Sequence, residues 1–276
     1  MTNDNNRNLP HFILVAAAKS GTTSLARYLG EHPDLYMPPH QVNFFHNDEE
    51  YPKGADAYAQ RFKDAPPNTK IGAHNPFYYA HAPVPGRMQE LLPEVKLIWL
   101  LRNPLTRTYS HYWFNVTRGT ERVPFSDIFT HDRWPHNYMR KSEYSDFIEH
   151  WLKFFKREQM HFVLSENLKT KKEETLTSIC RFLDIDDQYQ FQNLTTNARE
   201  TTLPRNIHLH RWLLTNRMKW GNGFKFVADR IIRLNQASAP GYPPIPENER
   251  EKLAHHFASK NAKLADLTGL DLSAWT

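Results

Sequence analysis

A short stretch near the N-terminus combines residue types that together bind anions. Residues 15–29 read VAAAKSGTTSLARYL, with one lysine, one glycine and several hydroxyl side chains close together. The alanines keep the turn narrow, and Gly21 lets the backbone approach a ligand closely. An apolar run precedes the turn and a helical pattern follows it, so free N–H groups at the helix start would face a phosphate-like group. The predicted anion ligands are Lys19, Ser20, Gly21, Thr22 and Thr23.

The position of the lysine distinguishes this turn from the loop of nucleotide triphosphatases. That loop ends in Gly-Lys-Ser/Thr, where the lysine and the hydroxyl position the triphosphate and its metal. Here Lys19 precedes Gly21 by two residues. At that place it could neutralise charge that develops on a leaving oxygen. The alternative interpretation is an ordinary strand-to-helix turn with a hydroxyl cap and a solvated lysine.

A second block contains a further pair of anion-binding residues. Residues 97–113 read LIWLLRNPLTRTYSHYW, so Arg102 ends a buried-strand pattern at the edge where such sheets bind ligands. Ser110 follows eight residues later on the expected helix. The two could hold one phosphate, with the guanidinium forming a forked pair of hydrogen bonds. An arginine after a strand is more often a surface or ion-pair residue when taken alone, but the two blocks together indicate a ligand with two separate phosphate groups.

The elements that must position these residues alternate along the chain. Strands are expected at residues 12–17, 42–45, 70–73, 95–101 and 160–164. Helices are expected at residues 22–29, 58–62, 86–92, 104–118, 143–156 and 171–183, with another after Pro243. This alternation predicts the α/β class, as a single domain whose mainly parallel central sheet is flanked by helices. We expect a disordered tail at residues 1–10 and one domain at residues 11–276.

Composition narrows the function classes. The 276-residue chain has a formal net charge of +5 but no dense basic cluster, which favours a polyanionic small ligand over nucleic acid. No apolar run approaches the length of a membrane span, and the polar N-terminus lacks the apolar core of a signal peptide. Cys180 is the only cysteine, which suits a cytoplasmic protein. The fifteen histidines show no ligand spacing, so no metal is expected.

The two blocks resemble those of the sulfotransferases that use 3'-phosphoadenosine 5'-phosphosulfate (PAPS). The family's Lys-Ser-Gly-Thr-Thr turn matches residues 19–23, and its Arg-Asn-Pro start with a later serine matches residues 102–104 and Ser110. Weaker similarity is found in SEYSDFIEHWLKFF, FVLSENL, SICRFLDI and LADLTGLDLSAW, so the resemblance covers residues 12–275. It implies a P-loop-like sulfotransferase fold.

The resemblance also implies roles for individual residues. Residues 19–23 would bind the 5'-phosphosulfate, and Arg102 with Ser110 would bind the 3'-phosphate. Arg199 matches a late basic segment near the nucleotide. The sulfuryl group would pass to an acceptor by in-line displacement and leave 3',5'-bisphosphoadenosine (PAP), while Lys19 stabilises the bridging oxygen. This scheme requires no metal.

One position departs from the family pattern. Many relatives, including the carbohydrate sulfotransferases, read Lys-Glu-Pro-His-Phe-Phe at the second strand, and the glutamate there is the general base. This chain reads HQVNFF from His40. Gln41 and Asn43 would face the same way and could bind an acceptor, but neither takes up a proton at neutral pH.

His74 is the candidate base. It lies in Ala-His-Asn-Pro, which is similar to the end of Lys-Thr-His-Leu-Pro, where the cytosolic small-molecule sulfotransferases have their histidine base. An imidazole has a suitable pKa for this work near neutrality. The alternative is a hydrogen-bonded turn residue before Pro76, since carbohydrate-type relatives usually have a glutamate at this place. His40 and His46 are weaker candidates.

We expect a small-molecule acceptor, such as a secondary metabolite, that offers a hydroxyl or an amine. Tyr78 and Trp113 are candidate residues of the acceptor pocket. The sequence identifies neither the acceptor nor the oligomeric state. Two other functions stay open: a phosphosulfate-binding protein with weak or no transfer activity, which Gln41 would permit, and an ATP-dependent P-loop kinase, against which the missing Gly-Lys-Ser/Thr argues.

Overall fold

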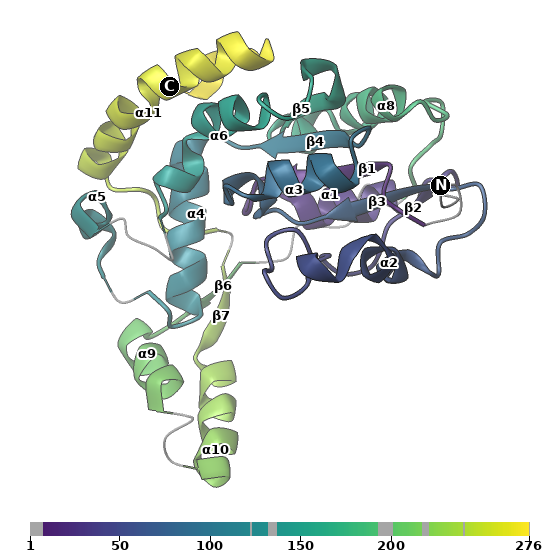
Figure 1. The fold of residues 1–276 in the computed structure, drawn as a ribbon. Coiled ribbons are helices and arrows are strands. Elements are labelled where there is room, and N and C mark those ends of the chain that lie inside the picture. The colour runs from purple at the N-terminus through teal and green to yellow at the C-terminus, as the bar shows by residue number, and fades with distance from the viewer. Residues whose placement is uncertain are drawn as a thin grey trace. The chain divides into compact units, whose positions relative to one another are not determined.

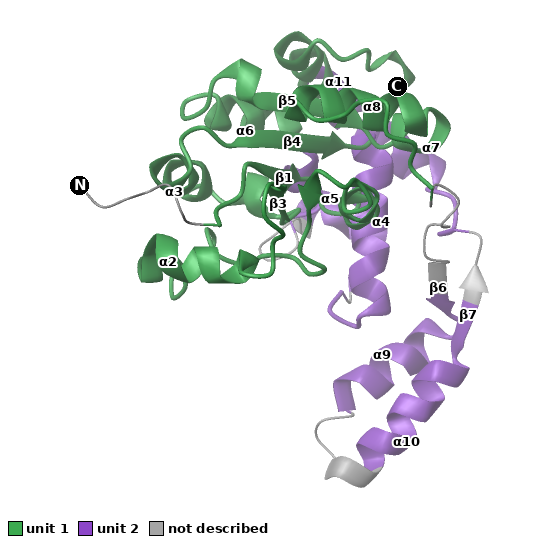
Figure 2. Cartoon of the chain, turned by 90° about the vertical axis from the view of Figure 1, so that its right-hand side faces the viewer, with its two compact units in different colours: residues 1–102, 144–196, 260–274 green, residues 103–143, 197–259, 275–276 purple. Residues whose placement is uncertain are grey.

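The computed structural model describes residues 8–121, 123–131, 137–192, 201–216, 221–239 and 241–275. The chain divides into two compact units (Figure 2). Unit 1 comprises residues 1–102, 144–196 and 260–274, and unit 2 comprises residues 103–143, 197–259 and 275–276. Each unit has a hydrophobic cluster of its own. The expected single domain over residues 11–276 remains a prediction, and residues 1–7 of the expected tail lie outside the described residues.

Unit 1 is built on a five-stranded sheet in the order β2-β3-β1-β4-β5 (Figure 1). The strands are β1 (Phe12–Ala16), β2 (Leu35–Tyr36), β3 (Lys70–His74), β4 (Lys96–Leu101) and β5 (Met160–Leu164). Every pairing in this sheet is parallel. All five residues of β1 are buried, as expected for a parallel strand that is covered on both faces. The α/β class with a mainly parallel sheet is therefore confirmed.

Helices cover both faces of this sheet. Those of unit 1 are α1 (Thr22–Leu29), α2 (Gly54–Ala59), α3 (Val84–Leu91), α6 (Tyr144–Trp151), α7 (Asn167–Thr170) and α8 (Lys172–Leu183). Ile98 and Leu100 of β4 point to the same side and join α1 and α8 in one hydrophobic cluster. Trp99 points to the opposite side, where its ring meets Trp151 of α6 edge to face at 5.4 Å.

Unit 2 is mainly helical. It contains α4 (Pro104–Thr117), α5 (Ile128–His131), α9 (Ile207–Asn216) and α10 (Gly221–Leu234), and residues 247–259 of α11 (Glu247–Thr268). The short strands β6 (Thr201–Pro204) and β7 (Gln236–Ala239) pair antiparallel. At the start of α4 the Asn103 side chain accepts hydrogen bonds from the Leu105 and Thr106 amides, and Pro104 occupies the first turn.

Several predicted elements differ from those observed. Residues 42–45 do not form a strand, because their backbone is held by single bonds to His74 and to the Tyr78 hydroxyl instead of a ladder. The helix expected at residues 143–156 is shorter, and α6 ends at Trp151. None of the described helices is both long enough and apolar enough to cross a membrane.

Candidate functional site

The loop between β1 and α1 is a tight turn with unusual backbone angles. The Ala17 amide donates to the Leu100 carbonyl at 2.8 Å, and the Ser20 amide donates to the Ala17 carbonyl at 3.1 Å. Gly21 has φ +98° at the N-terminal cap of α1, a left-handed conformation that favours glycine. Lys19 has φ +74°, which is uncommon for a residue with a side chain and is a form of strain found at ligand sites.

The start of α1 suits an anion. The first N–H groups of a helix have no intrahelical acceptor, and the positive end of the helix dipole lies there. The first turn of α1 contains no acidic residue that would compete for them. Thr22 is buried and Thr23 is exposed, so the two hydroxyl positions of this turn differ in their access to solvent.

The Ser20 hydroxyl is buried and has no hydrogen-bond partner among the described residues. The residue is only 2% exposed, and its Oγ makes no hydrogen bond with any described residue. The backbone at this position is fixed nonetheless, because the Ser165 hydroxyl donates to the Ser20 carbonyl at 2.6 Å. A buried hydroxyl left unpaired costs free energy, and a ligand oxygen in the turn would remove that cost.

Arg102 extends this anion site from the neighbouring strand. It directly follows β4, and its Nη1 donates to the Lys19 carbonyl at 3.0 Å. The Ser165 amide, directly after β5, donates to the Leu101 carbonyl at 2.7 Å. The residues that follow β1, β4 and β5 thus meet at the carboxyl edge of the sheet, where parallel α/β sheets bind ligands. Sequence analysis did not assign Ser165 a role, although a polar residue directly after a buried strand was a usable signal.

His74 lies at the same edge, on the other side of β1. It is the last residue of β3, in register with Leu14 of β1, and is 3% exposed. Its Nδ1 has no hydrogen-bond partner among the described residues. Burial lowers the pKa of His74 below its ordinary value, and the positive charge of nearby His40 lowers this pKa further. The ring is therefore neutral at pH 7 and able to accept a proton.

The segment with Gln41 and Asn43 runs along the end of β3. The Val42 amide donates to the His74 carbonyl at 3.1 Å, and Asn75 Nδ2 donates to Asn43 Oδ1 at 2.8 Å. Both Gln41 and Asn43 are exposed. The structure therefore ties this segment to the end of β3, and the role of Gln41 and Asn43 in binding an acceptor stays a prediction.

Tyr78 supports this segment from inside the unit. It is fully buried, its hydroxyl donates to the Val42 carbonyl at 2.6 Å, and the same oxygen accepts from the Phe44 amide at 3.1 Å. Burial raises the pKa of Tyr78 well above its ordinary value, so the hydroxyl stays protonated. The structure thus places Tyr78 behind the expected acceptor site, where it fixes the backbone.

Two expected site residues belong to unit 2, and a third is not among the described residues. Ser110 is buried on α4 of unit 2, whereas Arg102 belongs to unit 1, so their joint binding of one phosphate stays a prediction. Trp113, also on α4, stacks on the Tyr242 ring with centroids 6.1 Å apart. Arg199 lies outside the described residues.

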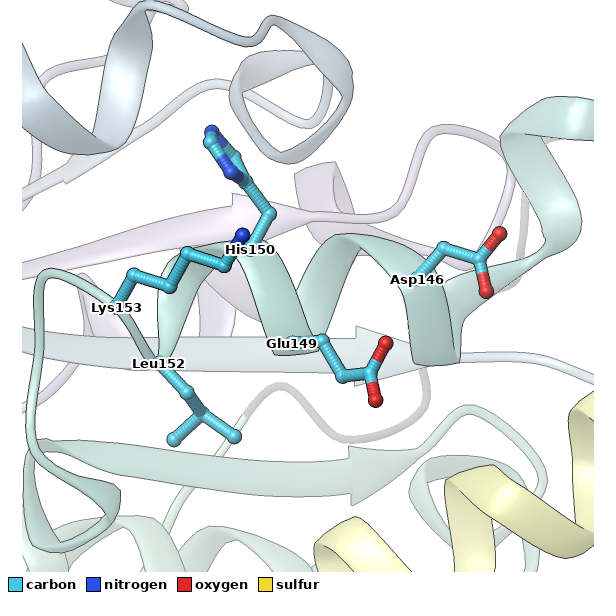
Figure 3. A pocket seen from close by; sticks show the side chains of 5 residues that line it. All are labelled: Asp146, Glu149, His150, Leu152 and Lys153. Atoms are coloured by element: carbon cyan, nitrogen blue, oxygen red, sulfur yellow. The ribbon is translucent and has the colours of Figure 1, made fainter.

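An open depression on α6 has no part in this site. Its lining residues are Asp146, Glu149, His150, Leu152 and Lys153 (Figure 3). Its two carboxylates are already paired, Asp146 with Lys260 at 2.9 Å and Glu149 with Lys263 at 2.6 Å. Within the part of the chain that the structure describes, no group of three or more His, Cys, Asp or Glu side chains is arranged to hold a metal ion.

Comparisons with known proteins show which family the chain resembles. The family model described as "Sulfotransferase domain" matches residues 9–222. Heparan sulfate glucosamine 3-O-sulfotransferase 5 of Mus musculus is 29% identical over 200 residues, which cover 69% of this chain and 58% of the relative. Bifunctional heparan sulfate N-deacetylase/N-sulfotransferase 1 of Caenorhabditis elegans is 25% identical over 275 residues, which cover 94% of this chain and 29% of the relative.

A solved structure is also similar over its whole length. The sulfotransferase from Alicyclobacillus acidocaldarius is 25% identical, with a TM-score of 0.68, and the match covers 97% of this chain and 98% of that one. The chain thus spans little more than half of the mouse relative and less than a third of the worm relative, but nearly all of this bacterial structure.

Proposed function

The chain belongs to the sulfotransferase domain family, and on that premise we propose that it transfers a sulfuryl group from PAPS to a hydroxyl or amine of a small-molecule acceptor. The observation that carries the proposal is the buried Ser20 hydroxyl, which has no partner among the described residues and lies in a turn that otherwise suits an anion. A phosphosulfate supplies the missing acceptor oxygens, and the turn supplies the donors.

The residues present fit the donor's phosphosulfate group. Residues 19–23 offer helix N-terminal amides, hydroxyls and one ammonium group, and Arg102 adds a guanidinium at the same edge. When bound, PAPS supplies an activated sulfuryl group with a phosphate as its leaving group. Lys19 stabilises the negative charge that develops on the bridging oxygen, and the fixed turn keeps its backbone in place without reorganisation. By family resemblance, Arg102 with Ser110 is assigned to the 3'-phosphate of the donor, and Arg199 to a basic segment near the nucleotide.

His74 is the proposed general base. Its neutral ring takes the proton from the attacking hydroxyl, since Gln41 and Asn43 are amides that cannot do so. No carboxylate contributes to the shift of the His74 pKa, so the ring is a weak base that suits an acceptor needing little assistance. An amine acceptor in its unprotonated form fits this description, because it can attack before it loses a proton.

Gln41 and Asn43 are proposed to bind the acceptor. The hydrogen bond from Asn75 occupies Asn43 Oδ1, which leaves the Asn43 amide N–H groups as donors toward the exposed side. Trp113 remains a proposed member of the acceptor pocket, and Tyr78 is proposed to act through the backbone of this segment. The named relatives act on heparan sulfate, so sugar hydroxyls and amines belong in the set of acceptors to test. The proposal keeps the cytoplasmic location expected from the single cysteine, Cys180.

A screen of acceptors with sulfur-35-labelled PAPS tests this function. Panels of amines, alcohols, phenols and glucosamine-containing saccharides are incubated with the chain, and labelled products are separated from the donor. We expect transfer to at least one class, without added metal. If the chain binds PAP but labels nothing across the screen, the phosphosulfate-binding alternative is correct. If ATP with magnesium binds instead of PAP, the kinase alternative is correct.

A further inference from the structure

Exposed apolar side chains concentrate on the two helices between β6 and β7. Among the described residues, every large apolar side chain that is clearly exposed lies there. On α9 these are Leu209 and Trp212, and on α10 they are Phe226 (69% exposed), Val227 (50%) and Leu234 (70%). Large contiguous apolar surface on a protein usually marks an interaction site. Both views show α9 beside α10 (Figures 1 and 2).

The exposed side chains of α10 form one stripe. At 100° per residue, positions 226, 227, 230, 233 and 234 fall within about a third of the helix circumference. Ala228 and Ile232 lie on the opposite side, where they pack with Leu213 of α9. The inner faces of α9 and α10 therefore already form a hydrophobic core between the two helices. We define the α10 stripe as Phe226, Val227, Arg230, Arg233 and Leu234. Its three apolar side chains are exposed and lie outside that core.

The α10 stripe is also basic. Its own charged residues, Arg230 and Arg233, are both exposed, and Lys225, which directly precedes Phe226 in the chain, is exposed as well. Across the described residues from β6 to β7, the basic residues are Arg205, Arg211, Lys225, Arg230 and Arg233, and the one acidic residue is Asp229. A second copy of the same face would bring like charges together. Apolar side chains interleaved with arginines instead suit a surface that is anionic at its boundary and apolar just below it.

We propose that the α10 stripe binds the surface of an anionic lipid bilayer. The helix lies in the plane of the interface, with Phe226, Val227 and Leu234 entering the headgroup region. Arg230 and Arg233 contact lipid phosphates, as basic residues beside an anionic leaflet do. None of these residues is among those proposed to bind PAPS or the acceptor, so this proposal rests on different side chains.

Co-flotation with lipid vesicles tests the proposal. The full chain is mixed with vesicles of equimolar phosphatidylglycerol and phosphatidylcholine, or with vesicles of phosphatidylcholine alone. We expect binding to the anionic vesicles and at least about tenfold weaker partition to the neutral ones. Phe226→Ser with Leu234→Ser removes apolar contact, and Arg230→Glu with Arg233→Glu reverses two charges. Each pair should lower the partition coefficient at least about tenfold.

A matched control uses exposed lysines of unit 1. Lys169→Glu with Lys171→Glu makes the same change in net charge, and its partition should stay within about twofold of wild type. Quenching of wild-type tryptophan emission by brominated lipid gives a second readout that needs no variant. The proposal is overturned if wild type ignores anionic vesicles, or if the lysine control loses binding as strongly as the arginine pair. It is also overturned if the serine pair abolishes self-association in sedimentation while leaving vesicle binding intact.

Discussion

Arg102 Nη1 donates a hydrogen bond to the backbone carbonyl of Lys19 at 3.0 Å, which ties the end of β4 to the anion-binding turn after β1. The guanidinium is a planar group that carries five N–H donors and a positive charge. One side chain thus fixes the backbone of the proposed catalytic lysine and adds positive charge beside it. The geometry explains why an arginine serves here better than a lysine.

Replacement of Arg102 by lysine tests this double role. Arg102→Lys keeps the charge but loses the forked pair of N–H donors. We expect at least a tenfold weaker affinity for PAP and a lower kcat, because a hydrogen bond that involves a charged group contributes on the order of 1.5–3 kcal/mol. Titration calorimetry and steady-state kinetics measure the two effects. Arg181→Lys, at an exposed ion pair with Asp187, is the matched control and should change neither. Equal behaviour of the two variants would count against the role of Arg102.

Removal of the unpaired hydroxyl should separate stability from binding. Because the Ser20 hydroxyl is buried without a partner, Ser20→Ala should leave the free energy of unfolding of the unliganded chain unchanged or slightly higher. Affinity for PAP should fall about five- to tenfold, since one hydrogen bond of about 1–1.5 kcal/mol is lost. Thermal unfolding with and without PAP measures both quantities.

Ser165→Ala is the partner experiment. It removes the bond to the Ser20 carbonyl, so it should lower the stability of the unliganded chain by about 1 kcal/mol. If Ser20→Ala destabilises the unliganded chain as much as Ser165→Ala does, the hydroxyl has a protein partner and its assignment to a ligand is wrong.

The pH dependence of sulfuryl transfer should reflect the protonation of His74. Burial lowers its pKa below 6.5, and the neutral form is the active base, so kcat/KM should fall as pH drops through that lowered value. His74→Gln should lose most activity and this acidic limb. The same shift makes the folded state less stable at low pH, because below about 6.5 the unfolded chain gains a proton that the buried ring does not.

His40→Gln is the control for the pH profile. It removes the nearby positive charge, so the limb should move to slightly higher pH while activity at pH 7 is kept. Retention of a wild-type profile by His74→Gln would show that the base lies elsewhere or is not needed.

Loss of the Tyr78 hydroxyl should weaken acceptor binding and leave PAP binding nearly unchanged. Tyr78→Phe leaves the Phe44 amide and the Val42 carbonyl without their partner, which costs about 1–3 kcal/mol of stability. The displaced segment carries Gln41 and Asn43, so we expect KM for the acceptor to rise while affinity for PAP stays within about twofold. A loss of PAP affinity as large as the rise in KM would contradict the placement of Tyr78 behind the acceptor site.

The alternation of apolar strands and amphipathic helices was enough to predict the α/β class. The turn between β1 and α1 was predictable too, because the residues that form it are consecutive and its geometry is local. The strand predicted at residues 42–45 was wrong, because an apolar run forms a strand only where a neighbouring strand pairs with it. The strands β6 and β7 were missed because Thr201–Pro204 and Gln236–Ala239 are short, carry little apolar pattern and pair across an intervening helix pair.

The acceptor side depended on contacts between distant residues. The segment that carries Gln41 and Asn43 is tied to the end of β3 by the bond from Val42 to the His74 carbonyl and by the bonds from Asn75 to Asn43 and Val42. None of these bonds has a sequence signature, so the residue types were predictable but their proximity was not. The unpaired state of the Ser20 hydroxyl is likewise a property of packing alone.

Calorimetric titration with PAP in the presence of EDTA tests the central claim most directly, because it needs no knowledge of the acceptor. The account predicts saturable one-to-one binding in the micromolar range or tighter, weakened at least about tenfold by Lys19→Ala, together with a fall of about 10²–10³ in kcat for that variant. ATP with magnesium should bind far more weakly than PAP. Absence of saturable PAP binding, or tighter binding of ATP with magnesium, would contradict the account.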